Sequence, residues 1–298
     1  MSLKIIYIQI VLKPTPRIMC KQKPDYFIAA ANNDMKLLNQ HINKSKNTFD
    51  RRSTNIEMNI FSGFGAIHYA AYHGNDEILR LLLPYEIGLQ TSETQVIVAP
   101  GFGTAQAKYK LADGSNCLMI ALLRKHISSL TLILDYIQNN QQSVDQIVGQ
   151  TNSMGLTNYI VASICNYPEA IHLLLNPTFI QKELFLVTDG DMTPSMNACF
   201  FGRHVTAICL GELFKNPEMR DSLTRMILNR DTEGQICVSH LKSNNFEKFG
   251  VPIDQMTEIR QIMTGVVYNA YQWAQGKPQF ELILKSFMKD QTIEQILQ

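Results

Sequence analysis

The chain has 298 residues, 45% of them hydrophobic, which is enough for the core of one long domain or two compact ones. Lys and Arg number 27 against 26 Asp and Glu, and the formal charge of +1 gives no general attraction to nucleic acid or to an anionic membrane. We therefore expect no nucleic-acid partner, and local surface patches must select any partner that binds.

The six cysteines are scattered along the chain without paired spacing. Most of them fall in expected helices, where a small apolar side chain fits well. We therefore expect reduced thiols and a cytoplasmic protein.

The chain opens with a mostly apolar stretch, KIIYIQIVL at residues 4–12. This stretch is too short to span a bilayer and lacks a small-residue cleavage site, so we expect neither a membrane span nor a removed signal peptide. Residues 1–21 are interpreted as an extension that forms a strand or covers the first helices. After Pro14 and Pro16, residues 25–42 predict a first pair of short helices.

The clearest helical pattern lies in residues 63–83, GFGAIHYAAYHGNDEILRLLL. Residues 66–72 carry one apolar face, the His73-Gly74-Asn75 turn interrupts it, and residues 76–83 carry a second apolar face. Such a pair leaves apolar surface on both sides unless a similar pair stacks against it. We therefore expect the unit to recur along the chain.

An insertion follows this unit at residues 86–111. The runs TQVIVA and AQAKYKL flank a turn-rich Pro-Gly-Phe-Gly tetrapeptide whose aromatic residue is Phe102. Extended runs around such a turn predict a β-hairpin. Phe102 would then be either an exposed anchor or part of a clasp folded onto the helices.

The helical pattern recurs in residues 112–140, 153–178 and 189–216. In the last of these, Thr193 can cap the first helix and Pro194 suits its first position, where the missing N–H costs nothing. Residues 231–250 keep only part of the pattern and predict a degraded unit.

The remaining residues, 251–298, predict a helical cap. Apolar residues recur at every third or fourth position from 256 to 274 and predict one long amphipathic helix that ends at residues 276–278. The pattern then continues to the end of the chain.

The recurring unit resembles the ankyrin repeat, with its Gly-x-Thr-Pro-Leu-His-x-Ala-Ala opening, Gly turn and Leu-Leu close. The match is densest at Gly63, Ile67, His68, Ala70, Ala71, Gly74, Glu77, Ile78, Leu82 and Leu83. The resemblance implies an all-α solenoid of about five to six helix-turn-helix units. Its approximate units are residues 22–60, 61–85, 112–140, 153–178, 189–216 and 231–250, with the hairpin inserted at 86–111.

The resemblance also implies a concave surface, formed by the first helices and hairpin tips, that binds a partner protein. Aromatic residues there would be candidate hot spots, unless they pack beneath the inserted loops. The position-by-position transfer gives Tyr69, Tyr72, His73, Phe102, Leu123, Arg124, Ile164, Asn197, Phe200 and Phe201 as candidate partner-binding residues.

Known enzyme motifs are not found in the sequence. Cys237 with His240, and Cys199 with His204 and Cys209, could be read as a nucleophile with its base or as metal ligands. They are better explained as buried core residues, because the spacing does not suit zinc and a buried thiol is inert. We therefore expect no catalytic residue, no metal and no cofactor, and we interpret His68 as structural.

The expected function is that of a non-catalytic, monomeric protein-binding module or scaffold. Two alternatives remain open. One is a secreted bacterial effector that acts on a host protein in the host cytosol, because the divergent repeats resemble ankyrin proteins that some intracellular bacteria deliver into host cells. The other is a cysteine-dependent enzyme activity in the C-terminal part of the chain.

Overall fold

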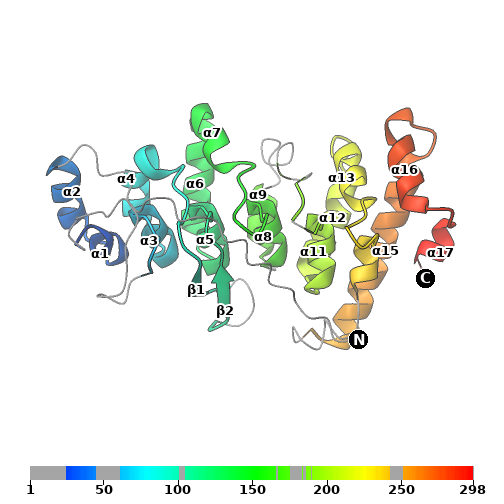
Figure 1. Ribbon diagram of the computed structural model, residues 1–298, viewed down its shortest axis with the longest axis horizontal. Coiled ribbons are helices and arrows are strands. Elements are labelled where there is room, and N and C mark those ends of the chain that lie inside the picture. The colour runs from blue at the N-terminus through cyan, green and yellow to red at the C-terminus, as the bar shows by residue number, and fades with distance from the viewer. Residues whose placement is uncertain are drawn as a thin grey trace, which may run out of the picture.

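The computed structural model describes residues 25–44, 61–100, 105–165, 167–174, 183, 186–188, 190–241 and 251–297. Over these ranges the chain is mostly helical, with one two-stranded sheet. The helices follow one another in a row from α1 at one end to α17 at the other (Figure 1). None of the described helices combines the length and the apolar composition that crossing a bilayer requires. The extension at residues 1–21 lies outside the described residues.

The first two helix pairs are α1 (Asp25–Ala31) with α2 (Met35–Lys44), and α3 (Ala66–His73) with α4 (Asp76–Glu86). Both pairs were predicted from the sequence and are confirmed. Gly74 ends α3 in the left-handed conformation, with φ of 73°. The second helix, α4, continues past the predicted end at residue 83.

The predicted hairpin is also confirmed. Strand β1 (Gln95–Val98) pairs antiparallel with β2 (Lys108–Leu111), and Val96 lies opposite Lys110. Ile97 and Leu111 are buried, whereas Val96 is exposed, as the two-residue period of a strand requires. We call β1 and β2 together the finger. Phe102 lies between them, outside the described residues.

Three further pairs match the predicted units: α5 (Cys117–Arg124) with α6 (Ile127–Asn139), α8 (Asn158–Ile164) with α9 (Pro168–Leu174), and α11 (Pro194–Phe200) with α12 (His204–Phe214). As predicted, Thr193 accepts a hydrogen bond from the Met196 N–H and Pro194 is the first residue of α11. Helices α7 (Gln141–Ile147) and α13 (Arg220–Ile227) were not predicted.

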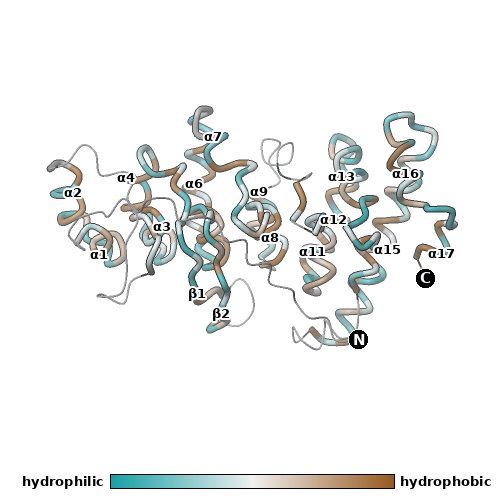
Figure 2. The backbone as a smooth tube through the Cα atoms, in the orientation of Figure 1, coloured by the Kyte–Doolittle hydropathy of each residue, from teal (hydrophilic) through white to brown (hydrophobic). Residues whose placement is uncertain are grey.

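The structure describes residues 231–241 of the degraded unit, and the helical element in this range is the 3₁₀ turn η2 (Cys237–His240). The predicted long helix is α15 (Ile253–Ala274), which packs against α12 and α13. A 3₁₀ turn, η3 (Pro278–Phe280), and the short helices α16 (Glu281–Met288) and α17 (Ile293–Leu297) follow. Hydrophobic and hydrophilic stretches alternate along the whole row of helices (Figure 2), as expected for helices that each bury one face.

Side chains near the start of the second helix of a pair reach back to the preceding pair. They donate hydrogen bonds to backbone carbonyls at the end of that pair's first helix, where the last carbonyls have no partner within the helix. These contacts, which we call ties, join successive pairs along the row. The ties run from Asn75 to Ala30 and Ala31, from His126 to Tyr72, from Tyr167 to Lys125, and from Thr206 to Ser163.

The turn before α3 gives the first testable prediction. Gly63 has φ of +80°, and an added Cβ would lie 2.7 Å from the Glu93 nitrogen. We expect Gly63→Ala to lower the free energy of unfolding by about 2 kcal/mol, because the backbone conformation is strained for alanine and the Glu93 backbone must move. Urea unfolding followed by circular dichroism measures the change.

Gly265 provides the matched control. It lies inside α15, and no atom lies within 4 Å of an added Cβ. Gly265→Ala should raise the free energy of unfolding by up to about 1 kcal/mol, because alanine favours the helix. Equal effects of the two substitutions would contradict the explanation.

Candidate protein-binding surface

The finger lies beside α5 and α8, which are the first helices of two successive pairs. The Arg124 Nη1 at the end of α5 donates to the Val98 carbonyl of β1 at 2.9 Å. Tyr109 of β2 packs against the core, where burial raises the pKa of its hydroxyl and the Cys165 thiol group at the end of α8 raises it further. The finger therefore contacts the end of α5 and comes close to the end of α8, while the alternatives for Phe102 stay untested.

Five of the candidate partner-binding residues are buried. Tyr69 is 1% exposed, its hydroxyl donates to the Phe61 carbonyl at 2.5 Å, and its ring stacks on the Phe61 ring. Of the two alternatives left open for the aromatic residues of α3, Tyr69 therefore follows the packed one. The buried candidates are Tyr69, Tyr72, Leu123, Ile164 and Asn197.

Three candidates, Tyr72, His73 and Arg124, meet at the turns beside the finger. The Arg124 guanidinium stands 4.3 Å from the centre of the Tyr72 ring, and its Nε donates to the Tyr72 carbonyl at 3.0 Å. His73, the exposed last residue of α3, has its ring 5.0 Å from the Tyr72 ring. His126 donates to the same Tyr72 carbonyl at 3.1 Å. We call His73, Arg124 and His126 the cationic turn cluster.

The histidines of this cluster titrate below their usual range. Burial lowers the pKa of His73, and the positive charges of Arg124 and His126 lower it further. Burial also lowers the pKa of His126; the Tyr72 carbonyl and the Asp76 carboxylate oppose this, while Arg124 adds to it. At neutral pH the lasting positive charge of the cluster is therefore that of the Arg124 guanidinium, which favours an anion, and the histidines add charge only at lower pH.

Phe200 and Phe201 form a second, half-buried patch. Their rings meet edge to face at 5.1 Å, and the Arg203 guanidinium lies 5.7 Å from the Phe201 ring. Asn197 beside them is buried and donates to the Thr193 carbonyl. The aromatic pair therefore remains a partly open apolar patch at the end of α11.

The cysteines considered as candidate nucleophiles are buried. Burial, and after it the neighbouring Cys237 thiol, raises the pKa of the Cys199 thiol well above its usual value. His240, on the same 3₁₀ turn as Cys237, lies with its Nε2 3.0 Å from an Asp231 carboxylate oxygen. No reactive, accessible thiol results from this arrangement.

The second grouping considered, Cys199 with His204 and Cys209, has its members engaged elsewhere. His204 pairs with Glu258 at 2.9 Å, and the Cys209 sulfur lies 3.7 Å from the His172 Nε2. Within the described ranges, no group of three or more His, Cys, Asp and Glu side chains could hold a metal ion.

His68 has a structural role in the α3 turn. Its Nδ1 accepts from the Gly65 N–H at 2.8 Å, so its Nε2 must carry the proton and donate to the Leu89 carbonyl at 3.0 Å. This buried imidazole joins the start of α3 to the segment after α4.

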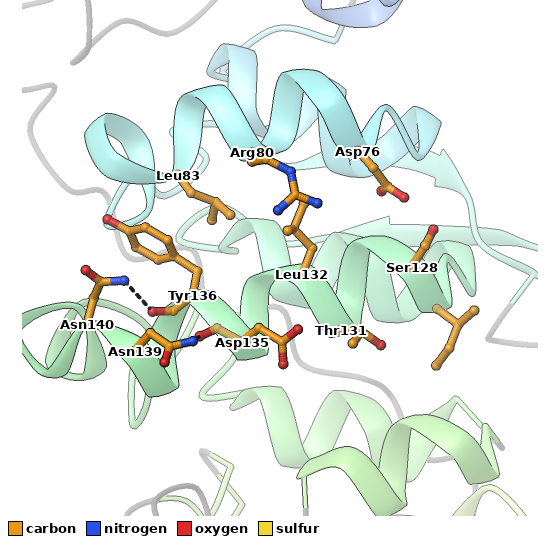
Figure 3. Close-up of a pocket in the computed structure, with 11 residues that line it drawn as sticks. Asp76, Arg80, Leu83, Ser128, Thr131, Leu132, Asp135, Tyr136, Asn139 and Asn140 are labelled. Carbon is orange, nitrogen blue, oxygen red and sulfur yellow. Dashed lines mark hydrogen bonds between the residues drawn. The ribbon is translucent and has the colours of Figure 1, made fainter.

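A groove that was not predicted runs between the second helices α4 and α6 (Figure 3). It has a volume of about 570 Å³, with Leu83 and Leu132 among the residues of its lining and Arg80 reaching between the helices. Asp76 at one end accepts a hydrogen bond from Ser129 at 2.5 Å. The lining of the groove carries charges of both signs, from Asp76, Arg80 and Asp135, so the groove favours no single class of ligand.

Two buried carboxylates were also missed by the sequence analysis. Glu86 accepts from the Tyr26 hydroxyl and from the Ile67 N–H, both at 2.8 Å, at the start of α3. Glu183 accepts from the Tyr159 N–H at 2.7 Å at the start of α8. In both cases an acidic group faces the N-terminal end of a first helix, where a negative charge is favourable.

Residues 26–143 match the family model for ankyrin repeats, in three copies. This match confirms the predicted resemblance to the ankyrin repeat family over these residues. No curated protein matches the chain significantly.

Proposed function

We propose that the chain is a non-catalytic protein-binding module, a monomeric stack of about five to six ankyrin-like units that ends in a helical cap over residues 251–298. Ankyrin repeats generally mediate protein–protein interaction, and repeat stacks offer extended surfaces for it. The binding surface in this proposal is the turn surface beside the finger, with His73 and Arg124 at one end and Phe200 and Phe201 at the other.

One observation carries the proposal. Arg124 is fixed by two backbone carbonyls, one in α3 and one in the finger, and it stands beside the exposed His73. A long cationic side chain held in one conformation loses little entropy when a partner binds. Arginine and aromatic residues are also the residue types enriched at binding hot spots.

The proposal places the protein in a cytoplasm. The five cysteines in the described part of the chain are free and buried, which suits a reducing compartment. A host cytosol would meet this condition equally well, so delivery as an effector is compatible with the proposal.

Photo-crosslinking tests the proposed surface. A benzophenone amino acid is placed at position 73 or 201 and, as matched controls, at exposed positions 80 and 212 on the second helices α4 and α12. We expect positions 73 and 201 to capture a protein partner from a cell extract while the two controls do not. Equal capture at all four positions, or capture at the controls alone, would contradict the proposal.

A further inference from the structure

The Arg124 guanidinium is held in place without an acidic partner. Its recorded hydrogen bonds, from Nε and Nη1, both go to backbone carbonyls, and its face lies on the Tyr72 ring. Within the described part of the chain, no carboxylate pairs with it, and Nη2 donates no hydrogen bond. A fixed guanidinium with a free donor is ready to receive an anion.

Two lysines stand close to Arg124 in the chain and in the sheet. Lys125 follows Arg124 and is exposed, and Lys108 of the finger lies opposite Val98, whose carbonyl holds Arg124. The acidic group that acts on the cluster from α4 is Asp76, which is engaged by Ser129. The positive charges of Arg124, Lys125 and Lys108 therefore outnumber the single negative charge from α4.

We propose that the cationic turn cluster binds a carboxylate side chain of an acidic segment in a partner protein, with Arg124 as the principal contact. This inference rests on the proposed function and names the chemistry of the partner. Val96, 61% exposed on β1, adds an apolar contact next to the charged one, so the segment should combine acidic and aliphatic residues.

The charge of the cluster favours a carboxylate over a phosphate. The Tyr72 and Val98 carbonyls engage the Arg124 Nε and one Nη1 hydrogen, which leaves the second Nη1 hydrogen and both Nη2 hydrogens for an anion. The one guanidinium carries a single positive charge, which matches a singly charged carboxylate. A lowered pKa also keeps His73 mostly neutral near pH 7, which reduces the charge available for a dianion.

Bound carboxylate should favour protonation of His73. The groups that face His73 are Arg124 from α5 and His126 from α6, both of which oppose its protonation, and a bound carboxylate would offset them. Because the pKa of His73 lies below its usual 6.5, binding should strengthen as the pH falls below about 6.5, where protonated His73 adds an attraction.

Fluorescence anisotropy with the full chain tests the inference. The probe is a labelled hexapeptide of four glutamates and two leucines, compared with a glutamine version, a phosphoserine version and inorganic phosphate as competitor. We expect Arg124→Gln to weaken binding of the glutamate peptide about tenfold and His73→Ala about threefold at pH 6. Arg80→Gln, which removes the same charge from α4, should leave binding unchanged.

Three outcomes would overturn the inference. The glutamine peptide could bind as tightly as the glutamate peptide, the phosphoserine peptide or phosphate could bind more tightly, or Arg80→Gln could weaken binding as much as Arg124→Gln. Because Arg124→Gln can also release the finger, thermal melting is measured in parallel. If that variant fails to fold, the exposed-site substitution His73→Glu decides, with about tenfold weaker binding expected and unchanged binding contradicting the inference.

The inference can fail separately from the proposed function. Crosslinking at position 73 does not depend on the charge of the partner. If capture at positions 73 and 201 persists while the glutamate peptide fails to bind, the inference alone is wrong. If capture at both positions is absent as well, the proposed function is wrong.

Discussion

Replacing Glu86 with alanine should lower the free energy of unfolding by about 4 kcal/mol. The Glu86 carboxylate is buried between two helix pairs, and it accepts from the Tyr26 hydroxyl of α1 and from the Ile67 N–H of α3. Alanine removes this acceptor from two buried donors and leaves a cavity behind. It also removes the negative charge that faces the start of α3.

Two control variants separate these effects. Glu77→Ala removes an exposed acidic residue from the same helix and should change the free energy of unfolding by less than about 0.5 kcal/mol. Tyr26→Phe removes one donor and should cost about 1 kcal/mol. Chemical denaturation measures all three variants, and a loss for Glu86→Ala no larger than that for Glu77→Ala would show that the carboxylate does not hold the pairs together.

Stability should fall with rising pH through the titration of Glu183. Burial raises the pKa of Glu183 from the usual 4.5 to about 7, although Asn158, Gly149 and Tyr159 donate hydrogen bonds that oppose the rise. A tenfold change in acid dissociation corresponds to about 1.4 kcal/mol, so ionising the folded protein at this site costs about 3 kcal/mol.

The sign follows from the raised pKa. Below pH 4.5 the Glu183 carboxyl is protonated in both the folded and the unfolded chain, and the folded chain has no cost of ionising a buried group. Between pH 4.5 and about 7 the unfolded chain loses this proton before the folded chain does, so the free energy of unfolding falls over this range. Above about pH 7 the carboxyl is ionised in both states and the fall is complete.

The Glu183→Gln variant isolates this contribution. Glutamine cannot ionise. The free energy of unfolding of the native chain, minus that of this variant, should therefore fall by about 3 kcal/mol from pH 5 to pH 8. Glu169→Gln, on the exposed side of α9, should show no such trend. Parallel pH profiles of the native and Glu183→Gln chains would rule out the assignment.

The helix pairs could be predicted because their signals are local. Apolar residues three and four positions apart, a turn glycine such as Gly74, and the Thr193-Pro194 start each act within one unit. The predicted hairpin and α15 rest on equally local patterns. Helix α7 was missed because only Val144 and Ile147 of its seven residues give an apolar signal. In α13, by contrast, Leu223, Met226 and Ile227 carry the three- and four-residue spacing of a helix, so the sequence does hold a signal for it.

The binding surface was predicted less well, because its exposure depends on contacts between distant segments. Tyr69 and Tyr72 stand where the family pattern expects open positions, yet packing against Phe61 and Arg124 buries them. Arg124 and His73 were predicted as candidates, but the role of His126 was not. The main contact between Arg124 and the finger goes to a backbone carbonyl, which no side-chain pattern records.

The ties between successive pairs explain how the chain accommodates its uneven units. Their donors are asparagine, histidine, tyrosine and threonine, and they act over separations of 42 to 54 residues. Every acceptor is a main-chain oxygen, which is present whatever residue evolution places there. A loop can therefore lengthen or change its composition while neighbouring units keep their alignment. The finger takes no part in these ties, so its outward residues can change without disturbing the contacts between successive pairs.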